Sequence, residues 1–483
     1  MSETHAESVA FVRDTMLPQA NPPTAQAGAV KWLRENLFSG PVNTVMTLVG
    51  LFVIWWIVTH FYDWFAHSVW NASSLAECRQ IIADTWGEGA RGACFAIIRE
   101  RWNQFIFGFY PVEQYWRPTL AFGMLFLVLG PVLFADSAKL RCIVTATAAV
   151  LTFICCQLLG APAVVLTIIA LVLVGLIALN ELAPRLALIC TLLYPFAGVW
   201  LLWGGSLWTI LMVLVGPFLG ILAWRLTSRF GMFAVAIGVA VMILWWSTMS
   251  GQAARDLQTL MPISLPAIQS SEFGGFLLAI TIGIAGIAMS LPAGIVLALA
   301  RQSDLPIVKM FAVVFIEFIR GVPLITLLFV ASLLLNYFLP PNTNFDIILR
   351  VIIMVTIFAA AYMAEVIRGG LAALPKGQYE AADALGLDYW KAQRLIILPQ
   401  ALKISIPGIV GTFIGMFKDT TLVGLIGLFD PLKGVPDFIR ANFAWKGVYW
   451  EPFVFVGAIF FVICFGMSRY SMYLERRLAR EHR

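Results

Sequence analysis

Long apolar runs, separated by short polar connections, dominate the hydrophobic pattern of this chain. A helix needs roughly 20 apolar residues to cross about 30 Å of hydrocarbon, and about twelve runs approach that length. Because backbone exposed to lipid must satisfy its own hydrogen bonds, each run is predicted to be helical. The pattern therefore predicts an all-α polytopic membrane protein, with spans at 41–62, 119–135, 142–159, 162–180, 187–203, 207–224, 232–248, 274–300, 310–338, 346–366, 402–427 and 453–470.

The chain divides near residue 250 into two groups of spans. The first group shows no catalytic pattern or internal repeat, which favours an accessory bundle that packs and anchors. The second group holds five spans and every candidate motif, and its run at 310–338 has room for a span and a surface helix joined at Gly321-Val322-Pro323. The predicted parts are a flexible cytoplasmic tail at 1–40, an accessory bundle at 41–250 with an outer insertion at 63–118, an outer connection at 251–273, a core at 274–474 and a basic cytoplasmic tail at 475–483.

Composition and charge agree with a membrane location. The chain is 60% hydrophobic and 12% charged, whereas a soluble globular protein is typically about a quarter charged. The basic residues form no stripe, so the sequence gives no sign of nucleic-acid binding. Most of the 32 Lys and Arg residues fall on one side of the predicted spans. By the positive-inside rule, both termini and the loop at 367–401 are expected in the cytoplasm.

The seven cysteines fall into two classes. Five lie in or beside apolar runs and are interpreted as small hydrophobic residues. Cys78 and Cys94 lie together in the polar outer insertion, where an oxidising compartment would allow a disulfide. Two free thiols explain the sequence equally well, so both alternatives stay open.

A polar unit between long apolar helices is the most informative local pattern. Residues 378–385 favour helix, and Gly386 suits the left-handed conformation that ends one. Asp388 is placed to cap a second helix, and Leu398-Pro399 is expected to close the unit. Ala381 and Ala382 are small enough to admit another protein's surface, with Leu385 as an apolar knob beside them. The unit is therefore predicted to contact a soluble partner, and the candidate contact residues are Glu380, Ala381, Ala382, Leu385 and Gly386.

The same residues carry a family resemblance. Glu380-Ala381-Ala382, Gly386 and Ile396-Ile397-Leu398-Pro399 are similar to the EAA-x3-G-x9-I-x-LP loop in the membrane subunits of bacterial binding-protein-dependent ABC importers. In that family the loop is the coupling helix, which docks in a cleft of the nucleotide-binding subunit. The resemblance implies the same task for this loop.

Flanking segments narrow the resemblance to permeases for polar amino acids. Residues 317–324 resemble the E-x-x-R-G-T-P-L segment, with Val322 in place of threonine, and 364–378 resemble the approach to the coupling loop. Residues 417–422 resemble the K-D/N-T/S-S/T-L signature. The extra spans and the outer insertion are similar to the large permease subunits of general L-amino-acid (Aap/Bzt-type) transporters of Gram-negative bacteria, which implies an inner-membrane location.

The resemblance implies a non-catalytic subunit with several partners. It implies an ABC ATPase dimer, a periplasmic amino-acid-binding protein and a second permease, which is either a homologue or another copy of this chain. ATP and Mg would be bound by the ATPase, because no Gly-rich loop of this chain ends in Gly-Lys-Ser/Thr. No cofactor or metal is expected in the chain itself, since its four histidines show no metal-ligand spacing. The alternative, an ion-driven secondary transporter, predicts inverted repeats and a midplane carboxylate relay, and the sequence shows neither.

Ionisable residues within spans mark candidates for the substrate path. In the run around Lys418-Asp419-Thr420-Thr421, Asp419 suits the ammonium of an amino acid, and Lys418 suits its carboxylate. A structural Lys–Asp pair, or a break in the helix, explains these residues equally well. Arg320 could line a cavity or bind lipid headgroups. Glu365 and Arg368 share a helix face, which favours a structural pair over a place in the path.

Overall fold

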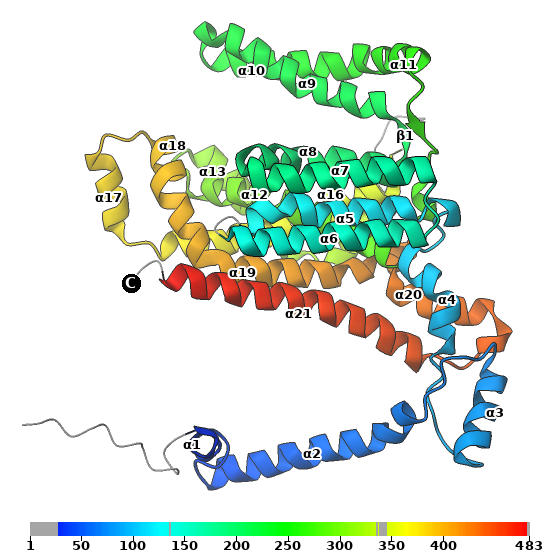
Figure 1. Cartoon of the computed structure of the whole chain (residues 1–483). Helices are drawn as coiled ribbons and strands as arrows, with labels where there is room; N and C mark the ends of the chain where they lie inside the picture. The colour runs from blue at the N-terminus through cyan, green and yellow to red at the C-terminus, as the bar shows by residue number, and fades with distance from the viewer. Residues whose placement is uncertain (1–27, 135–136, 335–336, 338–344, 481–483) are drawn as a thin grey trace, which may run out of the picture. The chain divides into compact units, whose positions relative to one another are not determined.

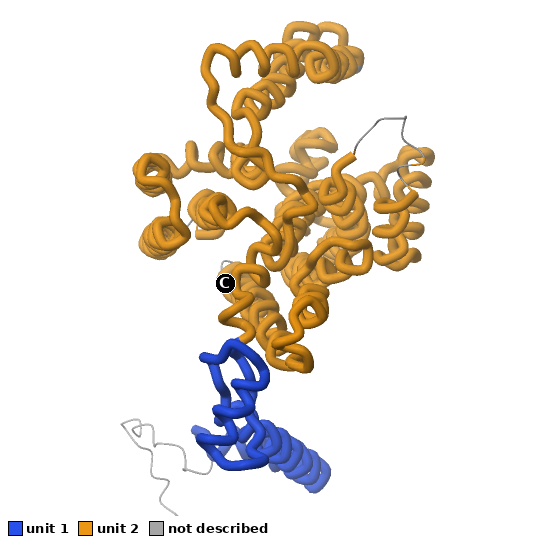
Figure 2. Tube along the Cα trace, turned by 90° about the vertical axis from the view of Figure 1, so that its right-hand side faces the viewer, with its two compact units in different colours: residues 1–96 blue, residues 97–483 orange. Residues whose placement is uncertain are grey.

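The computed structural model describes the chain except residues 1–27, 135–136, 335–336, 338–344 and 481–483, and it is almost entirely helical (Figure 1). It forms two compact units, residues 1–96 and 97–483 (Figure 2). Eleven described helices are long and apolar enough to cross a membrane, and one bent pair makes a twelfth. These findings confirm the predicted all-α polytopic class.

The first unit contains one long apolar helix and the disulfide. The Sγ atoms of Cys78 and Cys94 are bonded, and Val69 pairs with Cys94 in a short bridge beside them. The tail predicted to be flexible contains a helix at Gly28–Asn36, while residues 1–27 lie outside the described part. The helices are α1 (Gly28–Asn36), α2 (Pro41–Ala66) and α3 (Leu75–Trp86).

Four helices of the predicted accessory bundle, α5 to α8, pack together at the start of the second unit, and α4 precedes them. Their close approach is set by small residues, because a Cβ at Gly123 or Gly130 would overlap a threonine of α6. Buried polar groups bond across the bundle: Tyr194 Oη donates to the Ala121 carbonyl at 2.7 Å and Asn180 Nδ2 to that of Leu127 at 2.8 Å. The helices are α4 (Ala96–Phe107), α5 (Trp116–Leu133), α6 (Ala138–Leu158), α7 (Ala163–Leu182) and α8 (Pro184–Trp203).

The next two spans form a helical hairpin. Gly220 of α9 and Gly238 of α10 face each other so closely that a Cβ on either would crowd the other's carbonyl oxygen. The second span is longer than predicted, because a π turn held by Trp245 and Trp246 continues it into a polar, amphipathic stretch. The elements are β1 (Gly205–Ser206), α9 (Leu207–Leu226), α10 (Met232–Leu244), the π turn η4 (Trp245–Met249), α11 (Ser250–Leu260) and β2 (Ser264–Leu265), with β1 and β2 antiparallel.

The core is built on α12 and α16, which pack along their length. A Cβ at Gly294 of α12 would overlap the Met363 side chain of α16, so glycine allows this approach. The chain bends by 100° between α13 and α14, which confirms the break predicted at Gly321-Val322-Pro323. The helices are α12 (Gly275–Gln302), α13 (Pro306–Gly321), α14 (Leu324–Phe329) with the π turn η6 (Val330–Leu334), α16 (Ile347–Ala372), α19 (Leu398–Asp419), α20 (Pro431–Ala441) and α21 (Trp450–Arg480).

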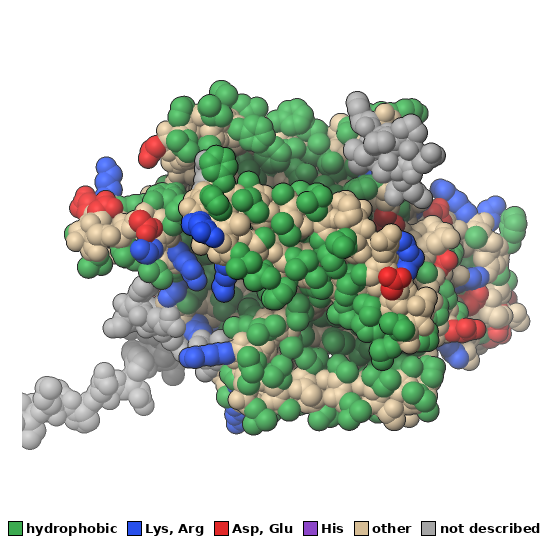
Figure 3. Space-filling view, turned by 90° about the horizontal axis from the view of Figure 1, so that it is seen from above, with side chains coloured by type: hydrophobic (Ala, Val, Ile, Leu, Met, Phe, Trp, Pro, Cys, Tyr) green, Lys and Arg blue, Asp and Glu red, His purple; other side chains and the backbone are tan. Residues whose placement is uncertain are grey.

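Several helices extend beyond the apolar runs that predicted them. Helix α16 continues to Ala372 inside the expected loop, and α21 continues to Arg480, into the stretch predicted as a basic tail. Hydropathy marks the part of a helix that lies in lipid, whereas helical hydrogen bonding continues into the water on either side. Figure 3 shows the result on one face, with hydrophobic side chains over its middle and charged ones mainly toward its two ends.

Candidate functional site

The polar unit predicted from the sequence is a helix–turn–helix at one end of the core. Helix α17 (Lys376–Ala384) and helix α18 (Tyr389–Ala392) project beyond the ends of the neighbouring spans (Figure 1). Gly386 has φ +67°, the left-handed conformation predicted for it. The N–H of Leu387 donates to the Ala382 carbonyl at 3.2 Å, and that of Gly386 to Asp383 at 2.9 Å, which satisfies the end of α17.

The second helix of the loop begins at the predicted cap. The Asp388 carboxylate accepts the N–H of Lys391 at 2.9 Å, and the Lys391 ammonium lies 3.0 Å away. The backbone N–H of Lys391 and its ammonium group hold the pKa of Asp388 below its usual value. Asp388 therefore stays ionised at neutral pH and fixes the direction in which the chain leaves the Gly386 turn.

Four of the five candidate contact residues are exposed to solvent, and one is buried. Glu380, Ala381 and Gly386 are exposed, and Leu385 presents 72% of its surface to solvent. Ala382 is only 1% exposed, because its side chain points inward and packs α17 against the chain. Ala382 therefore supports the loop from within, and a partner would meet the other four residues.

The structure adds two aromatic residues to this surface, and neither was among the contact residues predicted from the sequence. Trp390 is 70% exposed and Tyr389 is 51% exposed, with their rings 5.3 Å apart. Both follow the Gly386 turn directly. The sequence did contain a sign of them, an aromatic pair inside a loop predicted to be exposed to water. Large aromatic side chains are unusual there unless another surface covers them.

The base of the loop is fixed to the core. Gln400 of α19 donates to the Gln378 side chain of α17 at 2.9 Å, which ties the two ends of the loop together. Tyr379 packs against an apolar cluster that includes Leu374 and Ile397. The loop is thus held at its base while its tip stays exposed.

The expected closure of the unit at Leu398-Pro399 is wrong. The chain instead continues from α18 through a π turn (η7, Gln393–Ile397) directly into α19. Proline in an α-helix loses a hydrogen bond and its ring clashes with the carbonyl four residues earlier. The wider π turn, closed by the Leu398 N–H on the Gln393 carbonyl, gives Pro399 the room it needs. Helices α18 and α19 are therefore parts of one continuous helix.

An ionic network lies at the ends of α12, α13 and α16 on the same side as the loop. The Glu365 carboxylate lies 2.6 Å from Arg301, 2.9 Å from Arg368 and 3.8 Å from Arg320. Glu317 adds contacts to Arg301 at 3.0 Å and to Arg320 at 3.9 Å. The pair expected between Glu365 and Arg368 is confirmed, and it is one part of a five-residue cluster.

Arg320 belongs to this network as well. Its guanidinium lies over the Tyr362 ring at 5.4 Å from the centroid, in addition to its two carboxylate neighbours. Two roles were predicted for Arg320 from the sequence, lining a cavity or binding lipid headgroups. The structure places it between α13 and α16, where it joins the bent helix to the span that leads into the loop.

The second group of candidates lies elsewhere in the core. Helix α19 ends at Asp419 and changes to a 3₁₀ turn (η8, Thr420–Ile426). Thr420 is fully buried and donates to the Phe417 carbonyl, and Thr421 donates to that of Lys418. Within the described part of the chain, Lys418 and Asp419 form no ion pair. The structural Lys–Asp pair, one of the alternatives predicted from the sequence, is therefore not found.

The two groups of candidates do not form one site. Ser405 of α19 donates to the Val366 carbonyl, so this part of α19 lies next to Glu365. Asp419 follows Ser405 by fourteen residues, which places it roughly 20 Å further along the helix at 1.5 Å per residue. Arg320 and Glu365 therefore lie near the loop, while Lys418 and Asp419 lie near the opposite end of α19.

Comparison with known proteins decides the family. The family described as "Binding-protein-dependent transport system inner membrane component" matches residues 290–480. The permease protein BztC of the glutamate/glutamine/aspartate/asparagine transport system of Rhodobacter capsulatus is 55% identical over 98% of this chain and 99% of its own length. The inner-membrane amino-acid ABC transporter permease protein YhdY of Escherichia coli K12 is 35% identical over 93% of each chain.

The chain belongs to the amino-acid ABC transporter permeases. The family match covers α12 from Ser290 onward and the rest of the core, including the helix–turn–helix loop. Among solved structures, the "Crystal structure of an amino acid ABC transporter with histidines" is similar over 42% of this chain and 91% of that one, with 31% identity and a TM-score of 0.37. Its permease relatives and its long apolar helices show that this permease is a multi-pass inner-membrane protein of a transport system.

A buried carboxylate sits beyond η8 in this permease. Asp430 has no exposed surface and caps α20 by accepting the N–H groups of Leu432 at 2.9 Å and Lys433 at 3.3 Å. A Cβ at Gly424 would overlap its Oδ1 atom, so the carboxylate lies against η8. Burial raises the pKa of Asp430 to about 6, although both backbone N–H groups and Lys433 act in the opposite direction.

Asp430→Asn should flatten the pH dependence of stability between about pH 4 and 6. With the pKa raised from 3.8 to about 6, the folded state favours the protonated form. Its stabilisation is therefore complete below pH 4 and is lost as pH rises through 6, by up to about 3 kcal/mol. Asparagine keeps a capping oxygen but does not titrate there. Thermal midpoints of both proteins at pH 4.5, 5.5 and 7.0 measure the difference, and parallel profiles would contradict the assignment.

Proposed function

We propose that this permease and a homologous second permease enclose the path of an ATP-driven importer of L-amino acids. A periplasmic binding protein delivers the substrate, and separate ATPase subunits bind ATP and Mg. The observation that carries the proposal is the exposed α17–α18 loop, whose Glu380, Leu385 and Trp390 face water. Such a surface suits a docking contact, because apolar knobs and aromatic residues dominate the energetics of protein interfaces.

The position of the loop supports a coupling role. Its base is tied to α19 through Gln400 and Gln378, and α18 runs into α19 without a break. The network around Glu365 joins α12, α13 and α16 beside it. A push on the loop would therefore move several spans together. Alternating access needs such rigid transmission, since the energy of ATP binding must shift the equilibrium between two states of the path.

The distribution of charge supports one orientation of the chain. The basic residues gather on the side of the α17–α18 loop, which favours a cytoplasmic location for the loop and both termini. The Cys78–Cys94 disulfide belongs to the insertion that this orientation places in the oxidising periplasm. The two observations are independent and support the same topology.

Lys418 and Asp419 are the favoured contributors to the substrate path. They form no ion pair within the described part of the chain, and each keeps some exposed surface near the end of α19. Thr420 is buried and bonded to its own helix, while Arg320 and Glu365 are engaged in the ionic network. The relative BztC is a permease for glutamate, glutamine, aspartate and asparagine, which supports acidic amino acids and their amides as substrates.

Reconstitution tests the proposal against an ion-driven transporter. The permease would be placed in proteoliposomes with its second permease, ATPase and binding protein, and uptake of labelled L-glutamate and L-glutamine followed. Uptake should require both ATP and the binding protein, and collapse of ion gradients should not stop it. Uptake by the permease alone, driven by an H⁺ or Na⁺ gradient without ATP, would refute the proposal.

Glu380→Lys should reduce ATP-driven uptake at least tenfold with normal amounts of protein in the membrane. Glu380 is exposed on the loop, so its replacement leaves the fold intact but reverses a charge at the contact. Like-charge contacts at interfaces cost several kcal/mol. Asp256→Lys also reverses a negative charge, on an exposed face of α11, and this variant should keep full uptake. Equal uptake by both variants would count against Glu380 as a contact.

A further inference from the structure

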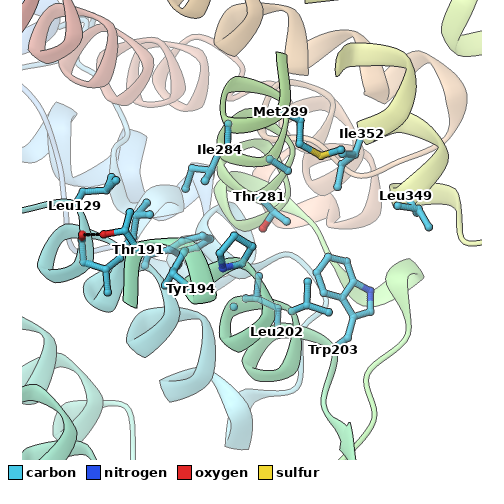
Figure 4. A pocket seen from close by; sticks show the side chains of 18 of the residues that line it. Leu129, Thr191, Tyr194, Leu202, Trp203, Thr281, Ile284, Met289, Leu349 and Ile352 are labelled. Carbon is cyan, nitrogen blue, oxygen red and sulfur yellow. Dashed lines mark hydrogen bonds between the residues drawn. The ribbon is translucent and has the colours of Figure 1, made fainter. Parts of the chain in front are cut away.

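A cavity of about 580 Å³ lies between the accessory bundle and the core (Figure 4). Helices α5 and α8 line it on one side, and α12 and α16 on the other. Leu129, Leu202, Ile284, Met289 and Ile352 surround it as apolar walls. Its volume lies within the range of roughly 300–1,000 Å³ that small-molecule sites occupy.

The cavity exists because the two groups of helices are joined at their ends. At one end the Trp203 Nε1 donates to the Ser270 hydroxyl at 2.8 Å, and Ser270 donates to Asp346. At the other end the Tyr470 Oη donates to the Leu133 carbonyl at 2.9 Å. The residues lining the space between include Gly198, Ala285 and Ala288, which are too small to fill it.

Away from the Asp346 end, the walls offer water almost nothing to bind. Thr191 donates to the Val128 carbonyl, Tyr194 to that of Ala121 and Thr281 to that of Leu277, so their hydroxyl hydrogens are already used. Figure 4 shows Thr191 and Tyr194 among the apolar side chains of the wall. Water needs two to four polar partners to occupy a cavity, and apolar cavities stay dry. An empty cavity would lose the dispersion contacts of its whole lining.

The open side of the cavity lies on membrane-spanning helices. Met289 is 49% exposed, Val199 46% and Leu349 45%, and all three are lining residues. Each belongs to a helix long and apolar enough to cross the membrane. The molecules that meet such a mouth in the membrane are lipids, whose tails match its walls in polarity.

We propose that this cavity is a binding site for the acyl chain of a bilayer phospholipid, with the headgroup at the Asp346 end. Asp346 lines that end, where its carboxylate caps α16 by accepting the N–H groups of Ile348 and Leu349. Its negative charge suits the ammonium of an ethanolamine headgroup. The lipid fills the seam between the accessory bundle and the core, and it gives the extra spans a defined contact with the permease core.

Filling the cavity tests the site. The double variant Gly198→Leu/Ala285→Phe places large apolar side chains in it, and a Cβ at Gly198 meets only ordinary contacts with the Tyr194 ring. The matched control Gly175→Leu/Ala240→Phe makes the same changes on exposed helix faces. Purified proteins would be compared by native mass spectrometry for bound phospholipid. Retention should fall at least fivefold in the filled variant and stay unchanged in the control. Equal retention in all three proteins would overturn the proposal.

A measurement on the unchanged protein guards against a filled variant that fails to fold. Phosphatidylethanolamine with a diazirine on its acyl chain would be added to membranes containing the permease and photolysed. Crosslinks should map to peptides of α8 and α12 that contain Val199, Ile284 and Met289. Crosslinks found only on other helices, or protein–protein crosslinks from this mouth to the second permease, would overturn the lipid assignment.

Asp346→Asn tests the headgroup end separately. Asparagine keeps an oxygen to cap α16 but removes the negative charge. The ratio of bound phosphatidylethanolamine to phosphatidylglycerol should fall at least threefold relative to the unchanged protein, with total bound lipid nearly the same. An unchanged ratio would remove Asp346 from the site.

Discussion

Replacing Gly386 with proline should abolish ATP-driven amino-acid uptake while leaving the permease in the membrane. Gly386 has φ +67°, whereas the proline ring fixes φ near −65°. The variant also loses the hydrogen bond from this residue's N–H to the Asp383 carbonyl. The turn between α17 and α18 would therefore open, and Leu385 and Trp390 would no longer present one surface. Initial rates of uptake in proteoliposomes, with ATP hydrolysis followed in parallel, measure the loss.

Gly377→Pro is the matched control for this experiment. Gly377 lies in the first turn of α17, where proline is tolerated because the N–H there has no partner within the helix. A Cβ at Gly377 meets nothing within 4 Å. This variant should keep at least half of the uptake. Undiminished uptake by Gly386→Pro would show that the turn does not couple ATP to transport, whereas loss in both variants would assign the effect to α17 as a whole.

The local structure of the loop was predictable because short-range rules determine it. Glycine is the residue that reaches positive φ without strain, and aspartate before a helical run is a common cap. Gly386 and Asp388 follow both rules in the structure. The spans were predictable for a similar reason, since lipid requires long apolar helices. These features depend on residues close together in the sequence.

Features that depend on contacts between distant parts of the chain could not be predicted from the sequence. The Ala382 side chain is buried because of the way α17 packs on the core. The π turn before Pro399 overrides a local rule, because α18 and α19 form one continuous helix. The network around Glu365 draws Arg301 from a helix more than sixty residues away, and the sequence paired Glu365 only with Arg368 on its own helix. Such contacts appear only when α12, α13 and α16 are placed together.

Glu365→Ala should destabilise the permease and weaken coupling at the same time. The Glu365 side chain is 16% exposed and lies between Arg301, Arg320 and Arg368. Without its charge, three guanidinium groups would remain close together, and Glu317 is the one carboxylate that the described residues leave in ion pairs with them. Removing one partner of a buried pair costs about 3–5 kcal/mol, and partial exposure reduces this to roughly 2 kcal/mol. The thermal midpoint of the purified protein should fall, and so should ATP-driven uptake.

The network itself supplies the controls. Glu181→Ala removes a carboxylate that lies 3.4 Å from Arg141 at the ends of α6 and α7, and it should lower the thermal midpoint by less than Glu365→Ala does. The double variant Glu365→Ala/Arg301→Ala relieves part of the repulsion and should recover part of the midpoint lost by Glu365→Ala. Recovery of the midpoint without recovery of uptake would show that the network transmits the motion of the α17–α18 loop, beyond holding α12, α13 and α16 together. A midpoint in Glu365→Ala equal to that of the unchanged protein would show that solvent already screens these charges.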